Sequence, residues 1–269
     1  MTITSIDNLV TAFNSPQLAA INKATIATQV AGGWTSLWRA TGQPAQGASP
    51  TTVAVYTSAN TGSLLALVNA TDPAQNYIGR MTMACGNAGT EIEVHDRLTA
   101  NGNLSGTVTT AQTFSAVLTT PAASGRCAVD GSDVMWWLEW YTATGATGVT
   151  ATVAYTDQTD TARTSPAITI PVSTAASRMI PIVPNPGQSI KSVTGVTLSG
   201  TTATAGAFGV TATKFLTSVP SLVANYTTIA DWAALALPMV ADSSCLMLVA
   251  QCTTTSSGTV AGTVRIVTG

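Results

Sequence analysis

The sequence predicts an all-β protein: an antiparallel β-sandwich or jelly roll, preceded by a short N-terminal helix and an extended arm. About one residue in six is threonine, and valine and threonine dominate the chain after residue 50, a composition typical of pleated strands. The apolar runs in this part are short and closely spaced, and Gly, Pro, Asn and Asp separate them. No helical pattern lies between these runs, which favours antiparallel pairing over a parallel α/β sheet.

The first thirty residues carry two helix-start patterns. Ser5 and Asp7 can cap a short helical turn. Ser15 followed by Pro16 is a second pattern, because a hydroxyl caps the helix and proline needs no N–H bond at the first helical position. Residues at helical spacing follow and end at a glycine pair, so a second helix is expected here; these positions are Leu18, Ile21, Thr25, Thr28, Gly32 and Gly33.

Residues 32–50, "GGWTSLWRATGQPAQGASP", show no period and are expected to form an extended arm. Trp34 and Trp38, together with Arg39, have the composition found at interface hot spots. They are therefore interface candidates, clamping a neighbouring subunit. The alternative is that both rings fold back onto the chain's own sandwich.

The remaining residues, 51–269, are assigned to one β-sandwich domain of jelly-roll type. Two segments, 132–156 and 243–267, share a plan: an apolar strand, a Thr/Ser/Gly loop, then a strand rich in valine and threonine. Each is expected to form a long hairpin with a wide loop. This correspondence favours one continuous sandwich over two unrelated domains.

The chain is unusually poor in charge, with 8% charged residues and a mean hydropathy of +0.31. Its most apolar window, 232–241, is about half the length of a membrane span, and the first residues lack the pattern of a secretory signal. Such a surface has weak protection against association. Either other subunits cover much of it, or threonine hydroxyls solvate a secreted domain. We prefer the first, because no export signal is recognised, and we expect no membrane partner.

Charge and metal-ligand patterns exclude several classes of partner. The ten basic residues form no run and the net charge is −2, so no nucleic-acid partner is expected. Cys85, Cys127, Cys245 and Cys252 have no CxxC spacing, and the chain has one histidine, so neither a metal nor a cofactor is expected. The cysteines are interpreted as small buried side chains, with a Cys245–Cys252 bridge across a hairpin as the main exception.

The histidine lies in "TEIEVHDRLTANGNLSG", residues 90–106. On a strand, Glu91, Glu93, His95 and Arg97 project from one face, which would be solvated or part of an interface. Catalysis there would need a further nucleophile or carboxylate, and the chain contains no GxSxG, HExxH or glycine-rich phosphate loop. We therefore assign no catalytic residue and expect no enzyme; these four residues are interface candidates.

The segment "DVMWWLEWY", residues 133–141, holds half of the tryptophans. Alternation divides it into two large, partly apolar faces: Trp136, Leu138 and Trp140 on one, and Met135, Trp137, Glu139 and Tyr141 on the other. The first interpretation is a central strand buried on both sides. The second is an aromatic platform for a sugar or a partner subunit.

Several of these stretches resemble virion structural proteins of tailed bacteriophages. The elements are a strand ending in Asp96, Arg97 and Leu98, a turn from Asn103 to Gly106, and a later segment from Tyr155 to Gln158. The opening "SIDNLVTAF…GGWTSLWRATGQP" is also similar, so the resemblance spans most of residues 1–170. It implies a phage particle component with a jelly-roll or related β-sandwich, acting in capsid cementing or decoration. It implies no catalytic residues.

The leading hypothesis is therefore a capsid cement or decoration subunit, located in the virion and assembled in the host cytoplasm. Its expected partners are the major capsid protein and copies of itself, as a homotrimer. Residues 1–50 would reach a neighbour, so their deletion should leave a folded sandwich. One alternative is a carbohydrate-binding or adhesive tail module using Trp136, Trp137 and Trp140. The other is the major capsid protein, less favoured because that fold needs a long helix.

Overall fold

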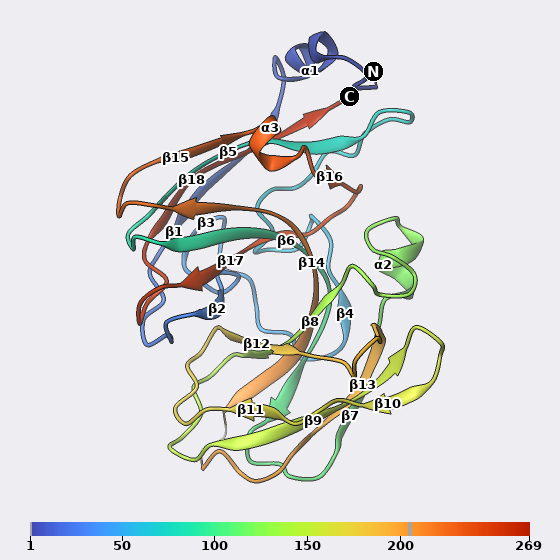
Figure 1. Ribbon diagram of the computed structural model, residues 1–269, viewed down its shortest axis with the longest axis vertical. Coiled ribbons are helices and arrows are strands. Elements are labelled where there is room, and N and C mark those ends of the chain that lie inside the picture. The colour runs from blue at the N-terminus through green and yellow to red at the C-terminus, as the bar shows by residue number, and fades with distance from the viewer. Residues whose placement is uncertain (1, 204–205) are drawn as a thin grey trace. The chain divides into compact units, whose positions relative to one another are not determined.

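A computed structural model describes residues 2–203 and 206–269, and its regular structure is almost entirely β. The strands pair antiparallel, and the helices of the described residues are short: α1 (Ile6–Ala12), α2 (Thr119–Ala123) and α3 (Trp232–Leu235) (Figure 1). The predicted all-β, antiparallel fold is confirmed. Among the described helices, none has the length and apolarity needed to cross a membrane.

The chain forms two compact units. Unit 1 comprises Met1–Ala48, Thr57–Asp96 and Leu216–Gly269, and unit 2 comprises Ser49–Tyr56 and Arg97–Phe215. Two long strands, β6 (Thr90–Ser105) and β14 (Ala207–Ser221), contribute residues to both. This division does not follow the boundary expected at residue 50, because the chain on either side of that position supplies strands to the sheets.

Unit 1 is a two-layered sandwich. One layer has the strand order β15-β5-β18-β1-β3, with β16 paired to β5, and the other contains β2, β17 and the first part of β6. Apolar side chains of β1, β5, β6, β17 and β18 fill the space between the layers. The bounds are β1 (Gln17–Lys23), β2 (Gly33–Ser36), β3 (Gly42–Gln43), β5 (Asn76–Cys85), β15 (Thr228–Asp231), β16 (Met239–Val240), β17 (Leu246–Cys252) and β18 (Val260–Thr268).

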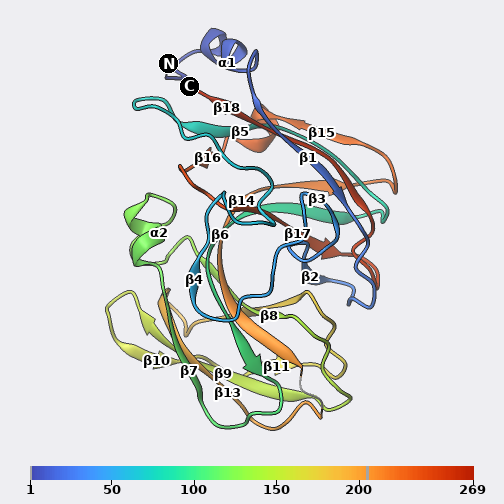
Figure 2. The ribbon, with the colours of Figure 1, turned by 180° about the vertical axis from the view of Figure 1, so that it is seen from behind.

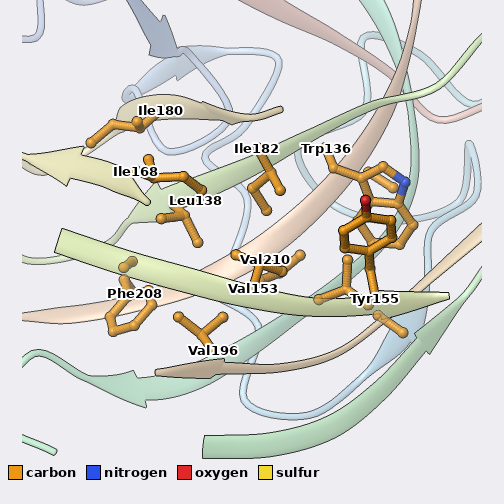
Figure 3. Packing of buried hydrophobic residues seen from close by; sticks show 14 of the residues in the cluster. Trp136, Leu138, Val153, Tyr155, Ile168, Ile180, Ile182, Val196, Phe208 and Val210 are labelled. Carbon is orange, nitrogen blue, oxygen red and sulfur yellow. The ribbon is translucent and has the colours of Figure 1, made fainter. Parts of the chain in front are cut away.

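Unit 2 repeats this plan with its own core. One layer has the order β10-β9-β13-β7, with β11 paired to β9, and β8 lies between β14 and β12 in the other. Figure 3 shows side chains of β8 and β9 meeting in the space between the strands, with Phe208 of β14 among them. The bounds are β4 (Ala54–Val55), β7 (Gln112–Val117), β8 (Met135–Trp140), β9 (Val149–Asp157), β10 (Ala162–Thr164), β11 (Ile168–Ile170), β12 (Arg178–Ile182) and β13 (Ile190–Leu198).

The N-terminal segment contains one helix rather than two. The Ser5 hydroxyl accepts from the Asn8 amide and caps α1, as predicted. The second helix was a wrong prediction, because Gln17–Lys23 forms strand β1 and pairs with β18 over seven residues. Its buried positions alternate, with Ala19 and Ile21 in the core. The ladder with β18 therefore outweighs the local helix-start pattern.

The two similar segments, 132–156 and 243–267, are not hairpins. In the first, β8 belongs to one layer of unit 2 and β9 to the other; in the second, β17 and β18 are divided in the same way in unit 1. Each segment therefore crosses from layer to layer. The two similar segments therefore occupy equivalent positions in the two sandwiches. The hairpin prediction was wrong because the loop in each segment crosses from one layer to the other instead of turning within one sheet.

All four cysteines are buried as small core side chains, and none of them forms a disulfide within the described residues. Cys245 immediately precedes β17 and Cys252 ends it. Cys252 lies seven positions after Cys245 along extended chain, which places the two roughly 23 Å apart, because a strand rises about 3.3 Å per residue. The alternative of a Cys245–Cys252 bridge is excluded by this geometry.

Candidate functional site

The charged stretch of β6 is buried in the folded chain. In unit 1, His95 is completely buried and Glu93 is 8% exposed. The His95 Nε2 lies 2.7 Å from Glu93 Oε2, and the Trp34 indole N–H of β2 donates to Glu93 Oε1 at 3.1 Å. A solvated face was therefore a wrong expectation at His95 and Glu93. The fold joins three interface candidates into one internal cluster.

The neighbouring acids of β6 are also satisfied within unit 1. The Ser218 hydroxyl donates to the half-buried Glu91 carboxylate. Asp96, 1% exposed, accepts from the Cys245 amide at 2.8 Å, at the start of β17. These contacts hold β6 against its neighbours.

Arg97 belongs to a second buried cluster, in unit 2. Its Nη2 lies 2.9 Å from Oε2 of Glu139, and the Thr211 hydroxyl donates to the same carboxylate oxygen at 2.6 Å. The guanidinium also lies over the Tyr56 ring, 4.8 Å from its centroid. The charge of Arg97 is thus compensated by a carboxylate, a hydroxyl and an aromatic face.

This environment fixes the charge states. Burial is the largest single effect and disfavours the charged form of Arg97, but Glu139, Tyr141 and Tyr56 together outweigh it, so the pKa of Arg97 is raised above its ordinary value. Burial and then the Glu139 charge raise the pKa of Tyr141, so its phenol stays protonated through the physiological range. The cluster is therefore a buried ion pair that contributes to the packing of unit 2.

Trp38 packs inside unit 1. It is 1% exposed and donates from its indole N–H to the Ala48 carbonyl at 3.0 Å. A Cβ added at Gly47 would lie 2.2 Å from the ring, and one at Gly62 would lie 2.9 Å from it. Trp38 therefore folds back onto its own chain, and its neighbour Arg39 is half-buried.

The tryptophan-rich strand β8 is central and buried on both sides, as the first interpretation predicted. Trp136 is 2% exposed, and Trp137 and Trp140 are completely buried. The Trp137 indole donates to Thr213 at 2.8 Å, and Trp140 stacks on Phe208 with centroids 4.6 Å apart. An aromatic platform for a sugar at these residues was a wrong prediction, because no ring face is open to a ligand.

The sequence interpretation missed an exposed apolar loop between β14 and β15. Its members are 72%, 59% and 67% exposed: Leu222, Val223 and Tyr226. The backbone is nevertheless fixed, because the Asn225 amide donates to the Cys85 carbonyl at 2.7 Å. We call residues 222–226 the apolar loop; it is the turn that joins β14 to β15 (Figure 2). In the sequence this loop is the run "SLVANY", whose large apolar side chains Leu222, Val223 and Tyr226 are exposed instead of packed in the core.

Unit 2 has a shallow cleft of about 380 Å³ lined mainly by apolar side chains. Lys191 and Asp160 lie at its wall and form an ion pair at 2.5 Å. None of the predicted site residues lines it. Within residues 2–203 and 206–269, no three His, Cys, Asp or Glu side chains gather into a possible metal site.

Comparisons with known proteins place this chain in no established family. No family model matches it, and no curated protein matches it. Among solved structures, it shows a weak similarity to the VP2 subviral particle of infectious bursal disease virus, with a TM-score of 0.21 and 11% identity. That alignment covers 94% of this chain and 79% of the VP2 chain. A TM-score this low does not establish a shared fold.

Proposed function

We propose that this chain is a non-enzymatic structural subunit of a virus particle, specifically a capsid cement or decoration protein of a tailed bacteriophage. Its partners would be the major capsid protein and copies of itself, as a homotrimer, in a virion assembled in the host cytoplasm. The observation that carries the proposal is the apolar loop. In a chain with 8% charged residues, this loop exposes three large apolar side chains, and its backbone is hydrogen-bonded to the sheet.

The loop has the physical character of a contact surface. Leu222, Val223 and Tyr226 are large side chains, and covering each would stabilise a complex by about 1.5–3 kcal/mol before the cost of association. The bond from Asn225 to Cys85 orders the backbone beforehand, so less conformational entropy is lost on binding. Exposed apolar groups of this kind mark interaction sites on folded proteins.

Two further observations support a particle component. The sequence resembles phage virion proteins over most of residues 1–170, and both units are antiparallel β-sandwiches. Three of the predicted interface candidates are not available for a contact. His95, Arg97 and Trp38 are buried within the chain, so the proposal now places the contact on the apolar loop.

The test is binding to shells purified from a phage that encodes this chain, with its gene deleted. The wild-type protein should co-sediment with these shells. A Leu222→Ser/Val223→Ser/Tyr226→Ser variant should bind at least about tenfold more weakly, because it lacks the apolar contact. The matched control is Val172→Ser/Val183→Ser, which removes side chains that are 58% and 59% exposed in unit 2.

Wild-type protein that fails to bind the shells would overturn the proposed function. Equal binding by the loop variant and the control would overturn the role of the apolar loop. Circular dichroism of each variant establishes that the sandwich is intact before binding is compared.

A further inference from the structure

Strand β13 of unit 2 carries a β-bulge at Lys191. Ile190 is opposite Asp157 of β9 and Ser192 is opposite Thr156, so Lys191 is an extra residue in the pairing of the two strands. Ile190 is buried in the core, whereas the next two side chains are half-buried and both border the cleft of about 380 Å³. The bulge therefore turns Lys191 and Ser192 together toward the cleft. Bulges redirect side chains in this way beside functional sites.

The cleft is built from the sheet and from α2, which directly follows β7 in the chain (Figure 1). Its floor is a row across three neighbouring strands, formed by Thr156 of β9, Ser192 of β13 and Val117 of β7. Val117 is 37% exposed and Val129, at the rim, is 72% exposed. Apolar side chains form most of the remaining wall: Leu118, Ala122 and Ala123. Apolar walls with a few polar groups are typical of small-molecule sites.

The turn between β9 and β10 holds Asp160 at the wall of the cleft. The Asp157 carboxylate accepts from the Thr159 and Thr161 amides at 2.8 and 3.0 Å and pairs with Arg163 at 2.9 Å. These contacts fix the turn that carries Asp160. The Asp160 carboxylate then lies 2.5 Å from the Lys191 ammonium, and both groups border the cleft. The polar side of the cleft is therefore arranged before any ligand binds.

These polar groups keep hydrogen-bonding capacity that the described chain does not use. The Lys191 ammonium has three N–H groups and donates to Asp160 Oδ1, and the described residues supply no acceptor for the others. Oδ2 of Asp160 accepts no hydrogen bond from them either. The hydroxyls of Thr119, Thr156 and Ser192 also lack a partner in this part of the chain, and all three residues line the cleft. Donors and acceptors thus both remain available beside an apolar surface.

We propose that the cleft of unit 2 binds a small neutral organic molecule with a compact apolar body and one hydroxyl or carboxamide group. The apolar body lies against Val117, Ala122 and Val129. The polar group lies against the Lys191–Asp160 pair. This binding site goes beyond the proposed function, because it belongs to unit 2 and shares no residue with the apolar loop of unit 1.

The ion pair determines that the ligand is neutral. Lys191 and Asp160 compensate each other, so a charged ligand would bring a charge without a counter-charge into a cleft from which it displaces water, which is costly. A hydroxyl or carboxamide both donates and accepts. It can therefore accept from the Lys191 ammonium and donate to Asp160 Oδ2 at the same time, whereas a carboxylate only accepts and an ammonium only donates.

The test is a titration of the full chain at pH 7 with three ligands that share one apolar body. These are cyclohexanecarboxamide, cyclohexanecarboxylate and cyclohexylmethylammonium, and amide NMR shifts give each Kd. The carboxamide should bind wild type with a Kd of about 1 mM or tighter, and at least about threefold more tightly than either charged ligand. The shifted amides should include those of Ser192 and Thr119.

Two single substitutions should change the order of the ligands in opposite directions. Asp160→Asn leaves the Lys191 charge without its carboxylate, so cyclohexanecarboxylate should become the tightest ligand. Lys191→Gln leaves the Asp160 charge, so cyclohexylmethylammonium should become the tightest. Lys214→Gln is the matched control, because it breaks another ion pair of unit 2 with the same change in net charge, but Lys214 does not line the cleft. It should keep the wild-type order.

A third variant tests the location. Ala122→Trp places a large ring in the cleft and should weaken carboxamide binding by at least about tenfold. If circular dichroism shows that this variant does not fold, Val129→Ser replaces it; it removes an exposed apolar contact at the rim and should weaken binding by about threefold.

Four results would overturn the proposal. One is the absence of carboxamide binding to wild type up to about 10 mM. The second is tighter binding of either charged ligand than of the carboxamide to wild type. The third is unchanged binding by the folded cleft variant, because the ligand would then lie elsewhere. The last is an unchanged order of ligands in both Asp160→Asn and Lys191→Gln, because the ion pair would then play no part in recognition.

Discussion

Arg97 of β6 and Glu139 of β8 form an ion pair of 2.9 Å in unit 2, with side chains 0% and 1% exposed. The pair joins two strands that lie far apart in the sequence. Its neighbours Tyr56 and Thr211 complete the contacts of the guanidinium and the carboxylate. Arg97, in the most charged stretch of the chain, therefore contributes to the packing of unit 2.

Removing one partner of this pair should destabilise unit 2 strongly. Glu139→Ala leaves a buried guanidinium without its carboxylate, and we expect a loss of about 3–5 kcal/mol in the free energy of unfolding. Urea denaturation followed by tryptophan fluorescence measures it. Lys214→Ala, which breaks the more exposed Lys214–Asp133 pair, should cost less than about 1 kcal/mol. Equal costs for the two variants would contradict the importance of burial.

Lys23 should make stability rise with pH under mildly alkaline conditions. Its side chain is 2% exposed, its ammonium donates to the Ala40 and Pro44 carbonyls, and burial lowers its pKa from 10.5 to about 8. Above about pH 8 the folded chain binds fewer protons here than the unfolded chain, so the free energy of unfolding increases with pH until the unfolded lysine also titrates.

The window for this measurement is pH 8 to 9.5, below the range in which the buried phenol of Tyr141 contributes. Urea melts of wild type and Lys23→Met across that window give the two slopes. The slope should be smaller in the variant, which has no amine to titrate. Parallel slopes would show that Lys23 keeps an ordinary pKa in the folded chain.

Two truncations should distinguish the contribution of α1 to stability from that of strands β1 and β2. Removing residues 2–14 deletes the helix and its Leu9 and Phe13 contacts but leaves β1, so we expect retained β-sheet circular dichroism with a melting temperature lower by roughly 5 °C or more. Removing residues 1–50 deletes β1 and β2, which pair with β18 and β17, and should unfold unit 1. A folded 51–269 fragment would support the original arm hypothesis instead.

The position of Trp38 depends on the absence of a side chain at Gly47. Gly47→Ala would place a Cβ 2.2 Å from the ring, and the resulting displacement should cost about 1–3 kcal/mol. Thermal unfolding measures the loss. Gly200→Ala is the control, because its Cβ would meet only an ordinary contact at 3.6 Å. A neutral Gly47→Ala would mean that the ring is free to move outward.

Local patterns in the sequence predicted the features that depend on neighbouring residues. The Ser5 cap of α1 was predicted because capping needs only residues within one turn. The central position of β8 was predicted because Trp136 and Trp137 place large apolar rings on both faces of the strand. The apolar loop was missed, since exposure of Leu222 and Tyr226 depends on what the rest of the chain covers.

Composition and short-range order thus determined by themselves that the chain is β-rich, antiparallel and poor in charge, because strand preference and turn chemistry act over a few residues. The tertiary structure alone decided that 17–23 is a strand, that the two similar segments cross between layers, and that Arg97 meets Glu139 while Lys191 meets Asp160. Each of these outcomes depends on which distant strands pair, and the energy of that pairing is shared between segments that no local window contains.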